Sequence, residues 1–273
     1  MRLINRRPSR ATAFALAAIP FAATVIAYAV ASHFRRQENP ADKLLPSLEQ
    51  MLGTFWRMAF VPERRSGDLV LWVDTVDSLW RLGLGMGVAT SFALIIGLLI
   101  GFIPHARAVL SPYIAAISLI PPITILPILF IMVGLGEASK IMLVALGTAP
   151  VMTRATAQAV MNIPRELVIK AQTLGASTWQ MMTRVVLPQV LPQLVTAVRL
   201  GLVPAWIFLI SAEAIASTSG LGYRIFLVRR FLAMDVILPY VVWITLLAYL
   251  LDRFLLFISR RAFPWAHLQG ESL

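Results

Sequence analysis

Long apolar runs, separated by shorter polar stretches, dominate the pattern of the chain. They lie at residues 11–31 and near residues 82–104, 109–133, 141–160, 193–216 and 236–258. About 20 apolar residues are needed for an α-helix to cross the hydrocarbon core of a bilayer. The pattern therefore predicts an all-α polytopic membrane protein with six transmembrane helices.

The first apolar run admits two interpretations. Four arginines precede it within the first ten residues, and Ala29-Val30-Ala31 at its end has the form of a signal-peptide cleavage site. Signal peptides, however, have apolar regions of about 7–15 residues, and this run approaches the length of a spanning helix. The length favours a retained first helix.

Basic residues predict the orientation of the helices, because loops rich in Lys and Arg stay in the cytoplasm. The arginine-rich start and the closing pair Arg260-Arg261 place both termini on the cytoplasmic side. The mixed-charge segment 33–78 is then periplasmic, and Ser47 and Gln50 in it form the capping box of a short amphipathic helix. This segment is either a solvated collar or a contact for an extracytoplasmic solute receptor.

Three arginines, Arg224, Arg229 and Arg230, disagree with this orientation because they fall on the outer side. Orientation follows the overall bias of charge and not each loop, so residues 220–234 are interpreted as an amphipathic outer or re-entrant segment. The predicted organisation is a tail with the first helix (1–32), a periplasmic segment (33–78), a membrane core (79–265) and a C-terminal tail (266–273).

Composition agrees with this class of protein. The 273 residues are 59% hydrophobic and only 14% charged, as expected of a polytopic membrane protein. The formal charge of +11 is explained by membrane topology, which excludes nucleic acid as the expected partner. The chain has no cysteine, so disulfides and thiolate metal sites are excluded.

A polar interruption at residues 162–192 has the signals of two short helices. Asn162 is the expected N-cap of the first helix, and Gly175 supplies its C-terminal stop. Ser177 and Gln180 form a capping box for the second helix, which Pro188 is expected to end. Neither helix is long enough to cross a bilayer, so the pair is predicted to contact a cytosolic partner protein.

The same interruption resembles the "EAA" cytoplasmic loop of ABC-importer permeases. The resemblance is carried by Ala171-x-x-Leu174-Gly175-Ala176-Ser177, Val186-Leu187-Pro188 and Leu191-Pro192. It continues in Arg199-Leu200-Gly201-Leu202, Ala212-Glu213-Ala214, Gly220-Leu221-Gly222-Tyr223 and Arg260-Arg261-Ala262-Phe263-Pro264-Trp265. From about residue 79 to 265 the chain is similar to the permeases for nitrate, sulfonate, taurine and bicarbonate, and also to a branch associated with urea-carboxylase-type genes.

The resemblance implies a type I ABC-importer permease fold in the bacterial inner membrane. The implied partners are a second permease, identical or paralogous, two nucleotide-binding ATPase subunits and a periplasmic solute-binding protein. ATP and Mg would be bound by the ATPase subunits, and this chain would bind no cofactor. The residues expected to couple to the ATPase are Glu166, Lys170, Ala171, Leu174, Gly175, Ala176 and Trp179.

The loop departs from the family pattern at one place. Ile169-Lys170-Ala171 stands where the family usually has Glu-Ala-Ala. The acidic contact expected of this loop is therefore missing or is replaced by Glu166, one turn earlier.

Other residues are candidates for a translocation path. Three prolines in the third run predict either a broken helix that lines a polar path or a packed structural kink. Glu213 either lines the path or its outer gate, where it would suit a cation such as guanidinium, or bonds the turn at residues 220–223. The candidates for path or gate are Pro121, Pro122, Thr124, Ser211, Glu213, Gly220 and Gly222.

Further motifs bear on chemistry and packing. Gly83-x-Gly85-x-Gly87 and Gly97-x-x-x-Gly101 are interpreted as helix-packing positions, within the bundle or between the permeases of a dimer. Arg154 and Arg199, on the cytoplasmic halves of their spans, are expected either to snorkel toward the cytoplasm or to face a cavity or a partner. The chain has no G-x-x-x-x-G-K-[ST] motif and no H-E-x-x-H motif, so it is not expected to be an enzyme. An ATP-independent channel or an intramembrane enzyme is the alternative to the importer permease.

Overall fold

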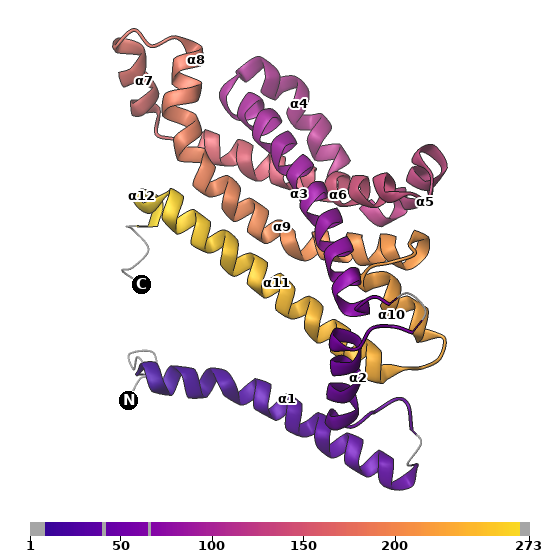
Figure 1. The fold of residues 1–273 in the computed structure, drawn as a ribbon. Helices are drawn as coiled ribbons and strands as arrows, with labels where there is room; N and C mark the ends of the chain where they lie inside the picture. Colours follow the sequence, from indigo (N-terminus) through magenta and orange to yellow (C-terminus); the bar gives the residue numbers. More distant parts are fainter. Residues whose placement is uncertain (1–8, 40–41, 65–66, 268–273) are drawn as a thin grey trace. The chain divides into compact units, whose positions relative to one another are not determined.

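A computed structural model describes residues 9–39, 42–64 and 67–267, and all of its regular structure there is helical (Figure 1). The arginines at positions 2, 6 and 7 and the end of the C-terminal tail lie outside the described residues. The helices are α1 (Arg10–Glu38), α2 (Leu48–Phe60), α3 (Val70–Phe102), α4 (Pro104–Ile117), α5 (Pro122–Val133), α6 (Glu137–Met161), α7 (Arg165–Thr173), α8 (Thr178–Met181), a π-helical turn (Met182–Val186), α9 (Leu187–Ala216), α10 (Leu221–Arg229), α11 (Met234–Ala262) and α12 (Pro264–His267).

The chain forms two compact units. The first unit comprises Met1–Leu69 and Val228–Val241, and the second comprises Val70–Leu227 and Val242–Leu273. In the first unit the predicted capping box is confirmed, because Ser47 and Gln50 cap α2 reciprocally. The hydroxyl of Thr54 on α2 donates to Asp235 at 3.0 Å, which joins α2 to the start of α11.

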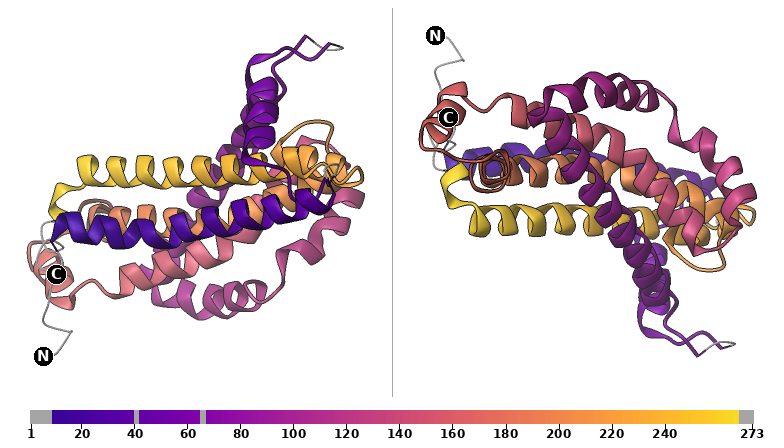
Figure 2. Two further views of the ribbon diagram at one scale, coloured as in Figure 1. Left: turned by 90° about the horizontal axis from the view of Figure 1, so that it is seen from below. Right: turned by 90° about the horizontal axis from the view of Figure 1, so that it is seen from above.

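Among the described residues, four helices are long and apolar enough to cross a membrane: residues 11–38, α3, the continuous helix from Thr178 to Ala216, and α11. The helices α4 and α5 pass the same test only as a pair, and they are bent by 93° relative to each other (Figure 2). They form a fifth span only if this bent pair is counted as one. The predicted third run is therefore a broken helix in the described residues. The count of six spans and the cytoplasmic termini stay predictions.

Close packing of α3 against α6 builds the core of the second unit. A Cβ atom added at Gly85, Gly97 or Gly101 would lie 2.7, 2.7 and 2.4 Å from the nearest side-chain atoms of α6. These three glycines therefore let the helices approach, as predicted. Gly83 and Gly87 have nothing within 4 Å, so they do not pack against another helix in the described residues, and their contact with a second permease stays a prediction. Residues two apart on a helix point in different directions, and only Gly85 of that triplet faces α6.

Two predicted helix boundaries are also wrong. Asn162 does not cap the first short helix; it ends α6, and its side chain accepts a hydrogen bond from Gln158 at 2.9 Å. Pro188 does not end the second short helix, which continues through the π-helical turn into α9. Proline disrupts a helix because it lacks an N–H and crowds the carbonyl four residues earlier. Here that carbonyl lies in the wider π turn, which accommodates the ring.

The second predicted span begins earlier than its apolar run. The run begins near residue 82, but α3 begins at Val70. The additional turns carry Asp74, Ser78 and Arg81, which are at most 3% exposed. Polar side chains can be buried in a helix when they have hydrogen-bond partners, and a count of apolar residues does not detect this.

Candidate functional site: an exposed elbow and a buried charge network

The polar interruption folds into an exposed elbow, which we define as residues 165–181. The helix α7 ends in a Schellman motif: the N–H of Ala176 donates to the carbonyl of Ala171 at 3.0 Å, and the N–H of Gly175 donates to that of Gln172 at 2.9 Å. Gly175 has a φ of 77°, which a side chain would strain. The predicted glycine stop is thus confirmed, and it sets the angle of the elbow.

The capping box predicted for the second arm of the elbow is also confirmed. The hydroxyl of Ser177 accepts a hydrogen bond from the N–H of Gln180 at 3.3 Å, and the side chain of Gln180 accepts one from the N–H of Ser177 at 2.9 Å. Local bonds therefore help to hold the elbow in shape, while Met181 at its end is buried.

Large apolar side chains on the elbow are left uncovered. Leu174 is 87% exposed and Trp179 is 68% exposed, and Ile169 is exposed beside them. Glu166 and Lys170 are exposed as well, and no ion pair involving either is found in the described part of the chain. An ordered segment with exposed aromatic and aliphatic side chains is typical of a surface that another protein covers.

The base of the elbow is anchored in the core of the second unit. Val186 in the π-helical turn is buried in a cluster with Leu98 of α3, Val160 of α6 and Val190 of α9. From Thr178 to Ala216 the helix is continuous. At 1.5 Å per residue, α9 alone is about 45 Å long, so the elbow and the turn before α10 lie at its opposite ends (Figure 1).

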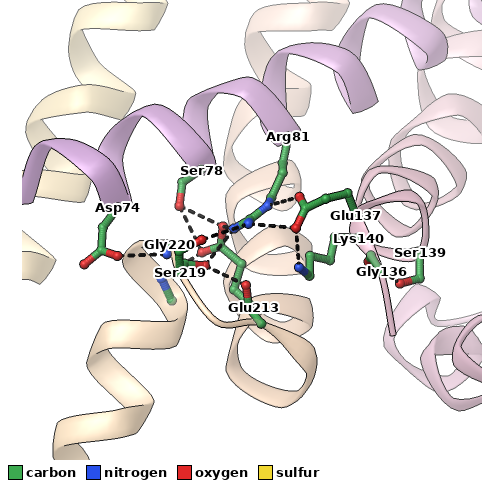
Figure 3. A network of polar contacts seen from close by, with 12 residues as sticks. Asp74, Ser78, Arg81, Gly136, Glu137, Ser139, Lys140, Glu213, Ser219 and Gly220 are labelled. Carbon is green, nitrogen blue, oxygen red and sulfur yellow. Dashed lines mark hydrogen bonds and ion pairs between the residues drawn. The ribbon is translucent and has the colours of Figure 1, made fainter. Parts of the chain in front are cut away.

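A buried charge network occupies the other end of α9 (Figure 3). The carboxylate of Glu213 is completely buried and accepts hydrogen bonds from the hydroxyl of Ser78 at 2.8 Å and from Arg81 at 2.7 Å. It also accepts the backbone N–H of Gly222 at 2.8 Å. Glu213 therefore bonds the turn at residues 220–223, one of the two roles considered for it, and its charge is neutralised by Arg81.

Arg81 connects this carboxylate to the start of α6. Its guanidinium forms an ion pair with Glu137 and donates to the backbone carbonyl of Ser219 at 2.8 Å. Lys140 donates to the same Glu137 at 2.7 Å. The hydrogen bond from Arg81, helped by Lys140, lowers the pKa of Glu137 to about 2 against the opposing effect of burial.

Asp74 fixes the turn from a second side. Its buried carboxylate accepts the N–H of Gly220 at 2.9 Å and pairs with Arg224 at 2.8 Å. Gly220 has a φ of 119°, and a Cβ atom there would lie 2.5 Å from the carboxylate of Glu213. Gly222 is equally confined, with the carbonyl oxygen of Ile210 at 2.8 Å. A side chain at either position would collide with these atoms, so both positions require glycine.

The sequence analysis missed the half of this network that lies on α3. Asp74, Ser78 and Arg81 are four and then three positions apart, which is the spacing of one helix face. That spacing was the available signal, but Asp74 and Ser78 belonged to the segment interpreted as periplasmic (33–78), and Arg81 precedes the apolar run that begins near residue 82.

The other predicted path residues lie elsewhere in the second unit. Pro121, Pro122 and Thr124 form the break between α4 and α5, where the hydroxyl of Thr124 donates to the carbonyl of Pro121 at 2.7 Å. The hydroxyl of Ser211 donates within α9, to the carbonyl of Ile207 at 2.7 Å. Of the path candidates, the structure thus gathers Glu213, Gly220 and Gly222 in the buried network and leaves the rest apart from it.

The two arginines expected to snorkel both have partners. Arg199 forms an ion pair with Asp252 of α11 at 2.8 Å, so it is not a simple snorkelling residue. Arg154 donates to the hydroxyl of Ser118 at 3.1 Å. In the described ranges, no group of three or more His, Cys, Asp or Glu side chains could hold a metal ion.

Comparison with known proteins places these features in a family. Residues 82–264 match the family model described as "Binding-protein-dependent transport system inner membrane component". The chain is 38% identical over 199 residues to the taurine transport system permease protein TauC of Escherichia coli, covering 72% of each chain. It is 32% identical over 212 residues to the putative aliphatic sulfonates transport permease protein SsuC of the same species, covering 78% of each.

A further relative and a solved structure agree with this match. The bicarbonate transport system permease protein CmpB of Synechococcus elongatus is 28% identical over 72% of each chain. A chain of the MetNI methionine ABC transporter, solved in inward-facing conformations, has 25% identity and a TM-score of 0.57. The similarity covers 70% of the present chain and 96% of the MetNI chain.

Proposed function

Because this chain belongs to the family of binding-protein-dependent transport system inner membrane components, we propose that it couples solute movement to partner ATPases and carries a small polar solute. It is a permease of the ABC-importer type and not an enzyme. The relatives named for taurine, aliphatic sulfonates and bicarbonate support a small anionic or zwitterionic cargo. The membrane is then the bacterial inner membrane, with the elbow in the cytoplasm.

The observation that carries the proposal is the exposed elbow at one end of a continuous helix. Leu174 and Trp179 would be the anchors that enter a groove of the ATPase subunit, and Gly175 would fix their angle. Such buried aromatic anchors commonly dominate the affinity of an interface. Ile169 stands at the position of the usual glutamate, and the neighbouring Lys170 would contact an acidic group of the ATPase.

The helical connection suggests how ATP hydrolysis would reach the solute path. Closure of two ATPase subunits would displace both elbows of a permease dimer, homodimeric or with a paralogue. Because the second arm of the elbow and α9 are one helix, its movement would be transmitted to the end that carries Glu213. There the buried network would hold α9 against α3 and the start of α6 while the other helices of the permease rearrange. ATP and Mg would stay on the partner subunits, and a periplasmic binding protein would deliver the solute.

The proposal is tested by replacing Trp179 with alanine. The tagged chain is purified with the products of its neighbouring genes and reconstituted in liposomes with the solute-binding protein, and ATP-dependent uptake of taurine is measured. Losing an interface anchor of about 2 kcal/mol or more should reduce co-purified ATPase and uptake at least about tenfold. Trp56→Ala is the matched control, since Trp56 on α2 is 64% exposed and lies outside the elbow.

Two results would contradict the proposal. Normal uptake and normal ATPase recovery in Trp179→Ala would remove the elbow from the coupling mechanism. Solute flux through the purified chain without any ATPase subunit would instead indicate an ATP-independent channel.

A further inference from the structure

A cavity of about 260 Å³ lies where the break between α4 and α5 meets α6 and α9. Its walls are largely apolar and include Pro122, Leu146, Leu200 and Phe208. The hydroxyl of Thr148 in the wall already donates to the carbonyl of Val144 at 2.8 Å. Because ligand pockets are commonly about 300–1,000 Å³, a cavity of this size suits a small molecule with an apolar part.

One edge of the cavity carries an arginine. Ser118 lines the cavity, and its hydroxyl accepts a hydrogen bond from Arg154 at 3.1 Å while donating to the carbonyl of Ala115 at 2.7 Å. Val151 and Ala155 line the cavity as well and flank Arg154 on α6. Arg154 is itself exposed and does not line the cavity, so its guanidinium is held beside the apolar space through Ser118.

Arg154 differs from the other charged side chains of the predicted spans. Arg199 is paired with Asp252, and Glu213 is paired with Arg81. Arg253 lies over the ring of Tyr249, with 5.0 Å between the guanidinium carbon and the ring centroid. Within the part of the chain that the structure describes, Arg154 forms no ion pair.

Arg154 also has unused hydrogen-bonding capacity. A guanidinium has five N–H donors, and the bond to Ser118 uses one of them. A cation without a carboxylate beside an apolar cavity favours a ligand that brings its own negative charge.

We propose that this cavity, with Arg154 and Ser118 at its edge, binds a small organic anion that has a short apolar chain, such as an alkanesulfonate. The planar guanidinium can donate two parallel hydrogen bonds to the oxygens of a sulfonate or carboxylate. The apolar walls accept the chain of the same molecule. The inference rests on the proposed function and assigns its cargo to an organic anion. It also removes the reason to expect a cation, because the carboxylate of Glu213 is buried and neutralised.

The test measures binding of radiolabelled ethanesulfonate to the full chain in lipid nanodiscs, with its co-purified ATPase subunits and without the solute-binding protein. Saturable binding is expected in the unmodified protein. Arg154→Gln should weaken it about tenfold or more, because charged hydrogen bonds are lost. Arg253→Gln is the matched control, since it removes an arginine that has no ion pair with the described residues and lies outside the cavity lining, and it should leave binding unchanged.

A second variant tests the cavity without changing Arg154, so that the result does not depend on the folding of Arg154→Gln. Ala155→Leu keeps Arg154 but fills part of the cavity from an exposed position on α6, and it should weaken binding as well. Unlabelled propionate, which shares the negative charge and the short chain, should compete with ethanesulfonate, whereas ethylammonium should not.

The outcomes separate the two proposals. Absence of saturable binding, or binding by Arg154→Gln and Ala155→Leu that equals binding by the unmodified protein, overturns the cavity as an anion site even if ATP-dependent uptake is intact. Absence of ATP-dependent uptake together with Arg154-dependent binding of ethanesulfonate would overturn the coupling function and leave the site in place.

Discussion

Replacing Arg81 with methionine would remove the cation from the buried charge network while keeping a side chain of similar length. The change leaves the carboxylate of Glu213, which is completely buried, without its charged partner. It also removes the hydrogen bond to the carbonyl of Ser219 in the turn before α10. Glu137 contributes little to the loss, because its side chain is 56% exposed and it keeps Lys140.

The expected loss of stability follows from the burial of the pair. Removing one partner of a buried ion pair costs about 3–5 kcal/mol, because the other charge stays buried and uncompensated. For a chain of this size, that corresponds to a decrease in melting temperature of roughly 6–20 °C. Thermal unfolding of the purified protein in detergent, followed by circular dichroism, measures the decrease.

A matched control separates burial from charge. Arg199→Met also breaks an ion pair, but the side chains of Arg199 and Asp252 are 25% and 35% exposed, so the expected cost is only about 0–1 kcal/mol. The double variant Arg81→Met with Glu213→Gln should regain much of the stability lost in Arg81→Met alone. Equal melting temperatures for Arg81→Met and Arg199→Met would refute the reasoning that burial makes the first pair indispensable.

Two further predictions concern packing and pH. Gly101→Ala should destabilise the protein by about 1–3 kcal/mol, because the added carbon would lie 2.4 Å from Val160, whereas Gly83→Ala, with open space around it, should not; chemical unfolding compares the two. The stability difference between the wild type and Glu137→Gln should be fully present above about pH 4.5 and should disappear as the pH falls toward about 2, because the ion pair with Arg81 holds the pKa of Glu137 in the folded protein below its ordinary value. A difference that does not change between pH 5 and 2.5 would contradict this role of Glu137.

Predictions based on neighbouring residues agreed best with the structure. The capping boxes that begin at Ser47 and Ser177 and the glycine stop at Gly175 were all predicted correctly. Each depends on hydrogen bonds between residues no more than five positions apart. The two wrong boundaries, at Asn162 and Pro188, were also predicted from local rules. In the structure Asn162 ends the preceding helix α6, and Pro188 continues from the π-helical turn into α9.

Predictions about charged side chains were less complete. The sequence indicated that Glu213 needed a partner and that the turn at residues 220–223 was a candidate, and the N–H of Gly222 is indeed bonded to it. It did not indicate Arg81, which lies 132 positions away and precedes the apolar run of its own helix. The importance of Arg154 emerged only when the other charged side chains of the spans were found to have charged or aromatic partners.

Apolar length and local hydrogen bonding are properties of consecutive residues, so the amino-acid sequence was enough to predict a helical membrane protein and to locate its capped elbow. Its resemblance to ABC-importer permeases added the expected function. Only the packed helices show which glycines of α3 face α6, which buried charges neutralise each other, and that Pro122 at the start of α5 lines a cavity whose wall residue Ser118 is bonded to Arg154. These features depend on the approach of helices from distant parts of the chain. A buried charge is stable only with a partner, and distance along the chain does not show which side chain that partner is.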